Sequence, residues 1–309
     1  MKKFLKISFV FSLVLVIFMS NIIVQAAVNQ TNGKSDFKNI LSDKELISKS
    51  TKLKEVANSS ESKKLISGNE EYINIITKID KDGNPISSSV KKYNKSNYLR
   101  VKTEQDAKQI LNSTNKVMSS SSSINQYDSK VINGWIRLTI NVFSSNGTNL
   151  DVYGFYEWLS RPNFTRDDIF AFAHDSNILF YNENAWSEHY YSWSDIRNPL
   201  NEGSVHLNSN NYNNYIHDIG GVGFKFDLAD TCGMYPDGKT AYPYGILYVP
   251  AKKANTFNEG AQIGLNYAHE QVGISFQPSV SIPLGVDINI SAASYYAKAL
   301  LSNVIDFTS

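Results

Sequence analysis

Apolar and polar side chains alternate along much of the chain from about residue 134 onward. Residues 135–142 place Trp, Arg, Thr and Asn alternately with Ile, Leu, Ile and Val, and residues 149–158, NLDVYGFYEW, continue in the same style. A period of two is typical of a strand with one buried face, and Asn146 and Gly147 between the two runs favour a tight turn. The pattern therefore predicts an antiparallel hairpin with one face directed to a core.

Further runs of this kind predict a mainly β chain. Residues 167–181 hold two apolar runs around an Asp-Ser-Asn turn. Short strands separated by Gly, Asn and Pro predict an antiparallel β-sandwich or an open barrel. The closing stretch 291–305 fits a helix as well as a last strand, because its apolar side chains recur near helical spacing. We expect the other strands at residues 222–227, 241–249, 260–267, 272–278 and 286–290.

The part that precedes this region differs in composition. Residues 27–127 hold few large apolar side chains, so we expect a basic propart that is disordered or weakly helical, because too little surface can be buried to offset the backbone entropy. Residues 104–118 predict one short helix, and five serines at 119–123 are typical of a flexible linker. We therefore expect an acidic β-rich propart at 128–227 and a C-terminal segment at 228–309, although 128–309 could also fold as one β domain.

The first 26 residues indicate export. Three lysines precede an almost wholly apolar run at 7–18, and Val-Gln-Ala at 24–26 supplies small residues for a signal peptidase. We expect a signal peptide at 1–26, cut between Ala26 and Ala27. A retained anchor is the alternative, but the apolar run is shorter than the roughly 18–20 residues needed to span a bilayer. The product is expected to be secreted and extracellular.

The distribution of charged residues divides the chain into nearly the same three parts. Residues 27–130 hold 18 Lys and Arg against 12 Asp and Glu, whereas 131–227 hold 5 against 11 and 228–309 hold 4 against 6. The basic block therefore has an electrostatic reason to lie against the acidic one, within a screening length of about 10 Å. The basic residues are scattered among acids without interleaved aromatics, which argues against nucleic-acid binding.

No catalytic or metal motif stands out, so we expect neither an enzyme nor a cofactor nor a metal site. His269-Glu270 lacks the second histidine of a zinc-protease helix. Asp167, Asp168 and Asp175 offer oxygen ligands for calcium, but a solvated loop is the commoner outcome. Cys232 is the only cysteine, which excludes an internal disulfide and leaves burial as a small hydrophobe or a free thiol paired with a histidine base.

Three tryptophans near glutamates suggest a sugar site. Trp158, Trp186 and Trp193 lie close in sequence to Glu157, Glu183 and Glu188, and aromatic rings with carboxylates are the groups that bind carbohydrate. Core packing is the competing interpretation for aromatic residues on strands. A glycan platform on these tryptophans would make the chain an uncut secreted β-sandwich that binds carbohydrate or a cell surface.

The arrangement of the chain resembles the preproproteins of closticin-type clostridial bacteriocins. The resemblance rests on total length, on the signal MKKFLKISFVFSLVLVIFMSNIIVQA, on the lysine- and serine-rich intervening part, and on a near-neutral tail that begins around FDLADTCGMYP. It implies a second cut between Asp227 and Leu228 by a maturation protease. The expected product is a secreted antibacterial polypeptide whose partner is a membrane or envelope receptor of the target bacterium.

Overall fold

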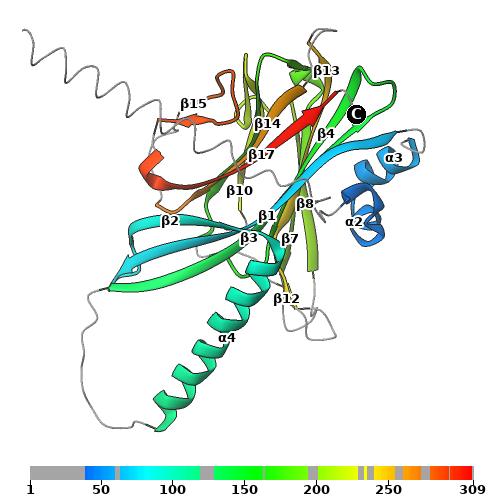
Figure 1. Cartoon of the computed structure of the whole chain (residues 1–309). Coiled ribbons are helices and arrows are strands. Elements are labelled where there is room, and N and C mark those ends of the chain that lie inside the picture. Colours follow the sequence, from blue (N-terminus) through cyan, green and yellow to red (C-terminus); the bar gives the residue numbers. More distant parts are fainter. Residues whose placement is uncertain are drawn as a thin grey trace, which may run out of the picture. The chain divides into compact units, whose positions relative to one another are not determined.

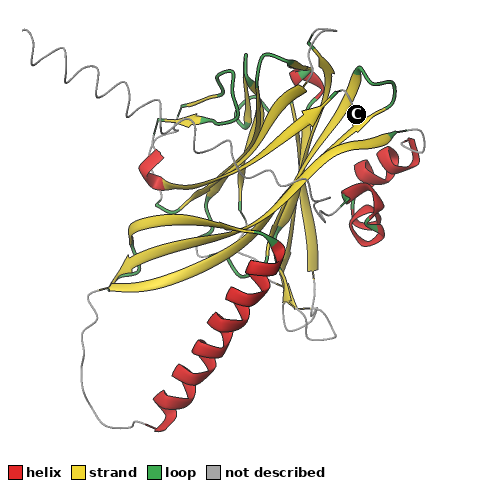
Figure 2. Ribbon diagram, in the orientation of Figure 1, coloured by secondary structure: helices red, strands yellow, loops and turns green. Residues whose placement is uncertain are grey.

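Strands make up most of the structure, which is a computed structural model (Figures 1 and 2). It describes residues 39–59, 63–118, 129–162, 164–193, 201–228, 233–234, 240–254, 260–272, 279–291 and 293–307. All of these belong to one compact unit, Phe37–Ser309. The predicted signal peptide, with Ala26 and Ala27, lies outside the described residues, and so does Cys232.

The larger sheet has eight strands, and every neighbouring pair is antiparallel. Their order is β2-β1-β3-β4-β13-β7-β8, with β6 paired to β13. The hairpin β3–β4 is the one predicted from the alternation, and Gly147 in its turn has a φ of 76°. The strands are β1 (Lys64–Asp80), β2 (Pro85–Tyr93), β3 (Ser129–Ser144), β4 (Asn149–Trp158), β6 (Ile178–Phe180), β7 (Trp186–Trp193), β8 (Asn201–Asn208) and β13 (Tyr244–Lys253).

The smaller sheet has five antiparallel strands in the order β17-β14-β5-β10-β9. Two further sheets have only two strands each, β11–β12 and β15–β16, and are called ribbons below. The strands of the sheet are β5 (Asp167–His174), β9 (Tyr215–Asp218), β10 (Gly221–Asp227), β14 (Gly260–Glu270) and β17 (Tyr296–Asp306); those of the ribbons are β11 (Gly233–Met234), β12 (Thr240–Ala241), β15 (Val280–Ser281) and β16 (Asn289–Ile290).

The main core lies between the two sheets. Ile136 and Leu138 of β3 belong to the same buried cluster as Phe170 and Phe172 of β5 and Leu265 of β14. Side chains of alternate residues on each strand therefore point into one apolar layer, which is the packing of a β-sandwich. The predicted fold class, a mainly β antiparallel sandwich, is confirmed.

Short helices cover the opposite face of the larger sheet. Tyr153 and Phe155 alternate with core residues along β4, and they pack with Ile40, Leu46 and Leu53. Asp43 caps α2 by accepting a hydrogen bond from the Leu46 amide at 3.1 Å. The elements in this cluster are η1 (Ile40–Ser42), α2 (Lys44–Lys49) and α3 (Thr51–Ser59); the remaining helices are α4 (Lys95–Met118), η2 (Asn182–Asn184) and η3 (Ala293–Tyr295).

Residues 64–93 differ from the expected poorly ordered or weakly helical propart. They form β1 and β2, and β1 pairs with β3 over almost its whole length, across the boundary expected near residue 128. The reason is burial: Ile73 and Ile75 are fully buried in the main core, and Tyr72 and Asn74 are buried on the other face. The predicted helix at 104–118 is present within the longer α4.

The closing stretch is a strand. β17 pairs with β14 along its whole length, and its buried and exposed residues alternate over Ala299–Asp306. Its polar side chains also tie the two sheets together, because the Asn303 amide donates to the Ser67 hydroxyl at 3.0 Å. The strand expected at 272–278 lies largely outside the described residues, and that expected at 286–290 is only the short β16.

The glycine-rich run before Asp227 is a packing feature. A Cβ atom built on Gly220 would lie 1.9 Å from the Pro283 carbonyl oxygen, and one on Gly223 would lie 2.3 Å from the Ala171 Cβ. Only glycine lets β10 approach β5 and the segment before β16 this closely. The paired glycines are therefore explained by the fold.

Candidate functional site

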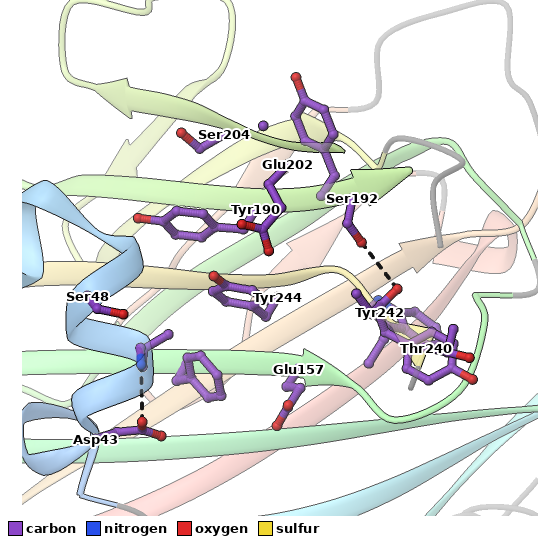
Figure 3. A pocket seen from close by; sticks show the side chains of 16 residues that line it. Asp43, Ser48, Glu157, Tyr190, Ser192, Glu202, Ser204, Thr240, Tyr242 and Tyr244 are labelled. Carbon is purple, nitrogen blue, oxygen red and sulfur yellow. Dashed lines mark hydrogen bonds between the residues drawn. The ribbon is translucent and has the colours of Figure 1, made fainter. Parts of the chain in front are cut away.

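A cavity of about 480 Å³ opens between α2 and the face of the larger sheet that the short helices cover (Figure 3). Its walls come from β4, β7, β8, β12 and β13, so residues far apart in sequence meet there. Five of the lining residues besides Trp158 are aromatic. The groups that define its chemistry are Asp43, Glu157, Glu202, Ser48, Ser192, Ser204, Thr240, Phe155, Tyr190, Tyr191, Tyr242 and Tyr244.

Two tyrosines form the aromatic wall of this cavity. The rings of Tyr190 and Tyr244 are stacked, with centroids 4.7 Å apart and planes at 12°. Phe155 lies beside Tyr244, with ring centroids 6.1 Å apart. Burial, and then the hydrogen bond to Glu188, raise the pKa of Tyr190 well above that of free tyrosine. The Tyr190 phenol therefore remains neutral, and the partly exposed Tyr244 ring is the one of the pair that offers an aromatic surface to a ligand.

Three carboxylates surround the aromatic wall. Asp43 comes from the start of α2, Glu157 from β4 and Glu202 from β8. Glu157 pairs with Arg137, which does not itself line the cavity. No lysine or arginine is among the lining residues in the described part of the chain. Acidic side chains therefore outnumber basic ones among the described lining residues, and the charge of Glu157 is balanced by Arg137.

The buried Glu188 carboxylate links the start of α3 to the larger sheet next to the cavity. Glu188 is 8% exposed, and it accepts hydrogen bonds from the Ser50 hydroxyl at 2.5 Å and from the Tyr190 phenol. The Ser50 oxygen also accepts from the Leu53 amide at 3.0 Å. His206 Nδ1 lies 3.5 Å from the other Glu188 oxygen. This network holds α3 and Tyr190 in a fixed position, which preorganises one wall of the cavity.

A second buried network joins β5 to β14. Asp168 and His269 are fully buried, and His269 Nδ1 lies 3.0 Å from Asp168 Oδ1. The same carboxylate accepts from the Tyr267 phenol and from the Glu270 amide, the latter at 3.0 Å. Trp158 donates its Nε1–H to the Tyr267 oxygen at 3.0 Å. Through these contacts Asp168 links β5 to β14.

The residues considered for calcium are used differently. Asp167 forms an ion pair with Lys225 at 2.6 Å, while Asp168 takes part in the buried network. Asp175 accepts from the Asn177 amide at 2.9 Å and the Gln262 amide at 2.8 Å. Within the described ranges, no group of three or more His, Cys, Asp and Glu side chains could hold a metal ion.

The tryptophans predicted to form a glycan platform are not the aromatic residues that are exposed in the cavity. Trp158 is 1% exposed and packs in the main core, where a sugar cannot reach its ring. Trp186 is 9% exposed and packs against Tyr248, with ring centroids 5.4 Å apart. Trp193 ends β7, but its side chain lies outside the described residues. The prediction is therefore corrected: among the described residues that line the cavity, the partly exposed aromatic side chains are Tyr191, Tyr242 and Tyr244.

The predicted cut between Asp227 and Leu228 falls at the end of β10. Leu228 is 2% exposed, and its amide donates to the Arg166 carbonyl oxygen at 2.9 Å. Asp227 is exposed and pairs with Asp167 in the strand register. Burial, and then the charges of Asp167 and Asp168, raise the Asp227 pKa. A protease must draw this bond out of the sheet before it can cut, since proteases bind their substrates as extended, accessible strands.

Comparisons with known proteins give no family. No protein-family model matches the chain, and no curated protein matches it. Among solved structures, the collagen-binding domain from a Staphylococcus aureus adhesin aligns with a TM-score of 0.27 and 6% identity, over 50% of this chain and 88% of that chain. The collagen-binding subdomain of the Enterococcus faecalis surface protein ACE aligns with a TM-score of 0.26 and 7% identity, over 50% and 84%. Likenesses at these TM-scores carry no argument about function.

The longest helix in the described part of the chain is α4, with 24 residues. None of the helices in the described part of the chain is both long enough and apolar enough to cross a membrane.

We expect acid to destabilise the sandwich through His189. The imidazole is buried between Tyr156, Ser187 and Phe226, and burial lowers its pKa from 6.5 to about 3. Below pH 6.5 the unfolded chain gains a proton there that the folded chain excludes. The free energy of unfolding therefore falls by about 1.4 kcal/mol per pH unit from pH 6 to pH 4 on account of this residue.

Urea unfolding at pH 7, 6, 5 and 4 measures this slope. His189→Gln should lower the slope by about 1.4 kcal/mol per pH unit relative to the unchanged chain. His217→Gln, at an exposed histidine, should leave it unchanged. Equal slopes in the chain and in His189→Gln would contradict the assignment.

Proposed function

We propose that the chain is the secreted precursor of an antibacterial polypeptide, and that residues 228–309 are the active part. Signal peptidase cuts between Ala26 and Ala27, and a maturation protease cuts between Asp227 and Leu228. The released segment acts on the envelope of related Gram-positive bacteria, through the membrane or an envelope receptor. The resemblance to closticin-type preproproteins supports this proposal.

The packing of the C-terminal segment is the observation that carries the proposal. Its strands β13 and β14 bury Ile246, Leu247, Ile263 and Leu265 completely. β13 is hydrogen-bonded to β4 and β7, and β14 to β5, all of which precede the cut. Exposing such side chains to water costs about 1.5–3 kcal/mol each. The preceding strands thus shield an apolar segment that, once released, is stabilised by an apolar acceptor such as a bilayer.

Fractionation of the culture medium of producing cells tests this proposal. Each fraction is assayed for growth inhibition of related Gram-positive strains, and its proteins are identified by intact mass and N-terminal sequencing. We expect inhibition to follow a species that begins at Leu228. The control is the chain that begins at Ala27, which should be inactive because its apolar strands are covered. Inhibition that follows the uncut chain, or none with a species beginning at Leu228, would refute the precursor proposal.

The cavity favours a second candidate function, an uncut module that binds carbohydrate on a cell surface. Stacked tyrosine rings, carboxylates and hydroxyl groups are the groups that recognise sugars, and here they line one concave site. Glycan-array binding by the full chain tests it. Tyr244→Ala should abolish binding, whereas Tyr212→Ala, at a tyrosine that is 83% exposed outside the cavity, should not. Failure of the full chain to bind any glycan would exclude this candidate.

A further inference from the structure

The edge strands of the two sheets differ in how well they are protected against pairing with another chain. The strand orders end in β2 and β8 for the larger sheet, and in β17 and β9 for the smaller one. β2 begins with Pro85 and carries the exposed lysines Lys91 and Lys92. Proline lacks an amide hydrogen and lysine carries a charge, so both hinder the approach of a further strand. β9 has only four residues, and β15 lies beside it.

The edge of β17 is capped by side chains of the larger sheet. Three backbone carbonyl groups, each two residues from the next, accept hydrogen bonds from β1 and β2. They belong to Leu300, Ser302 and Val304, and their donors are Lys92 Nζ, the Asn69 side-chain amide and the Ser67 hydroxyl. Side chains thus take the place of a strand that could otherwise pair with β17.

β8 has none of these protections. Its sequence, NEGSVHLN, contains no proline, lysine or arginine. Among the described residues, β7 is the only strand that pairs with β8. Ser204, Val205 and His206 are exposed, and Val205 is the apolar one, at 41%. An edge strand of eight residues with these properties is a surface to which another strand can be added.

We propose that β8 pairs with β8 of a second copy of this chain, antiparallel and about a two-fold axis at Val205. Each Val205 then faces its counterpart, Ser204 faces His206 of the other copy, and Gly203 faces Leu207. Like charges directly opposite each other destabilise a strand pair, and this register contains none. The inference depends on neither of the candidate functions.

Two observations favour a second copy over an extended peptide of another protein. The two-fold axis brings the exposed Val205 side chains together, so each covers apolar surface of the other. Residues 203–207 contain no lysine, arginine, aspartate or glutamate, so charge gives this stretch no preference for an acidic or a basic peptide. A two-fold pair also uses the open edge of both copies, and association therefore stops at the dimer.

The pairing has a consequence for the cavity. Ser204 lines it, and facing residues of antiparallel strands lie on the same face of a sheet. The two cavities of a dimer therefore open on one face of a continuous sheet. If the second candidate function holds, a polysaccharide with repeated units can occupy both cavities, which raises its avidity without any new contact.

Sedimentation velocity of the full chain, from about 1 to 300 μM, measures the association, because a pair of edge strands lies at the small end of interface sizes. We expect a reversible equilibrium between monomer and dimer. A monomer at every concentration would overturn the proposal and leave β8 to an extended peptide of another protein. Growth beyond the dimer would overturn it as well, since a two-fold pair leaves no open β8 edge.

Val205→Lys tests the position of the axis. It should weaken the dimer at least about 10-fold, because two lysines then face each other. Val304→Lys is the matched control: Val304 is also 41% exposed on an edge strand, but that edge is capped. This control should dimerise as the unchanged chain does. Urea unfolding checks that both variants are folded. Undiminished dimerisation of Val205→Lys would contradict the proposed interface.

A charge pair across the axis identifies both the partner and the register. Val205→Lys and Val205→Glu should each be monomeric alone at concentrations where the unchanged chain dimerises. An equimolar mixture of the two should dimerise again, because opposite charges then face each other. An extended peptide of another protein cannot produce this rescue. A mixture that stays monomeric would overturn two-fold pairing at Val205.

Discussion

A chain cut between β11 and β12 will elute from a native gel-filtration column as one species that contains both pieces. The C-terminal piece keeps β13 between β4 and β7, and β14 beside β5. It also holds eleven buried side chains of the main core, and six of these, at about 1.5 kcal/mol each, oppose separation by about 9 kcal/mol, which corresponds to a dissociation constant below about 1 μM.

The cut is made at a specific protease recognition sequence inserted within residues 235–239, which lie outside the described part of the chain. Denaturing electrophoresis confirms that the bond is broken, and gel filtration in concentrated guanidinium chloride should resolve the two pieces. If the pieces separate in native buffer at micromolar concentration, strand pairing does not retain the segment. Retention would place the control of antibacterial release at disassembly, after the cut.

The second large effect is expected at Asp168. Replacement by Ala leaves three buried donors without their acceptor: the Tyr267 hydroxyl, His269 Nδ1–H and the Glu270 amide. Each unsatisfied buried donor costs about 1–3 kcal/mol, so Asp168→Ala should lower the free energy of unfolding by at least about 3 kcal/mol. Chemical denaturation followed by tryptophan fluorescence measures the loss, since Trp158 belongs to the same network.

The neighbouring residue supplies a matched control. Asp167 is ion-paired with Lys225, but its side chain is 41% exposed, so Asp167→Ala should cost no more than about 1 kcal/mol. Asp168→Asn, which keeps one acceptor oxygen, should fall between the two alanine variants. Similar losses in Asp167→Ala and Asp168→Ala would mean that the buried network does not hold β5 to β14.

Much of the sandwich could be predicted from the sequence, because its strands carry the period-two pattern that a half-buried sheet imposes. The β3–β4 hairpin and the positions of β5, β10, β13 and β14 follow from this alternation and its turns. β1 and β2 were missed, although Asp82 and Gly83 mark their turn. Lysines, serines and glutamates on these strands lowered the apolar content below that expected of a strand, because the buried part of β1 is a short central stretch that includes Tyr72, Ile73 and Ile75.

The cavity could not be predicted for a different reason. Its walls bring Asp43 together with Tyr190 and Tyr244, about 150 to 200 residues later in the chain, and single-sequence periodicity contains no information on such contacts. The tryptophans were predicted to bind sugar because aromatic rings beside carboxylates suit carbohydrate, but the large Trp158 ring fills the core instead. Two of the lining tyrosines, Tyr242 and Tyr244, alternate with buried residues in AYPYG, and this alternation is the local clue to their partial exposure.

The walls of the cavity come from all three parts into which the sequence divides: α2 from the first, β4, β7 and β8 from the second, and β12 and β13 from the third. Any molecule that binds there binds only the assembled chain. By mass action, a ligand at 100 times its dissociation constant therefore stabilises the assembly by about 2.7 kcal/mol. A ligand in the cavity would thus add to the strand pairing that retains the C-terminal segment, and removal of the ligand would subtract only that contribution.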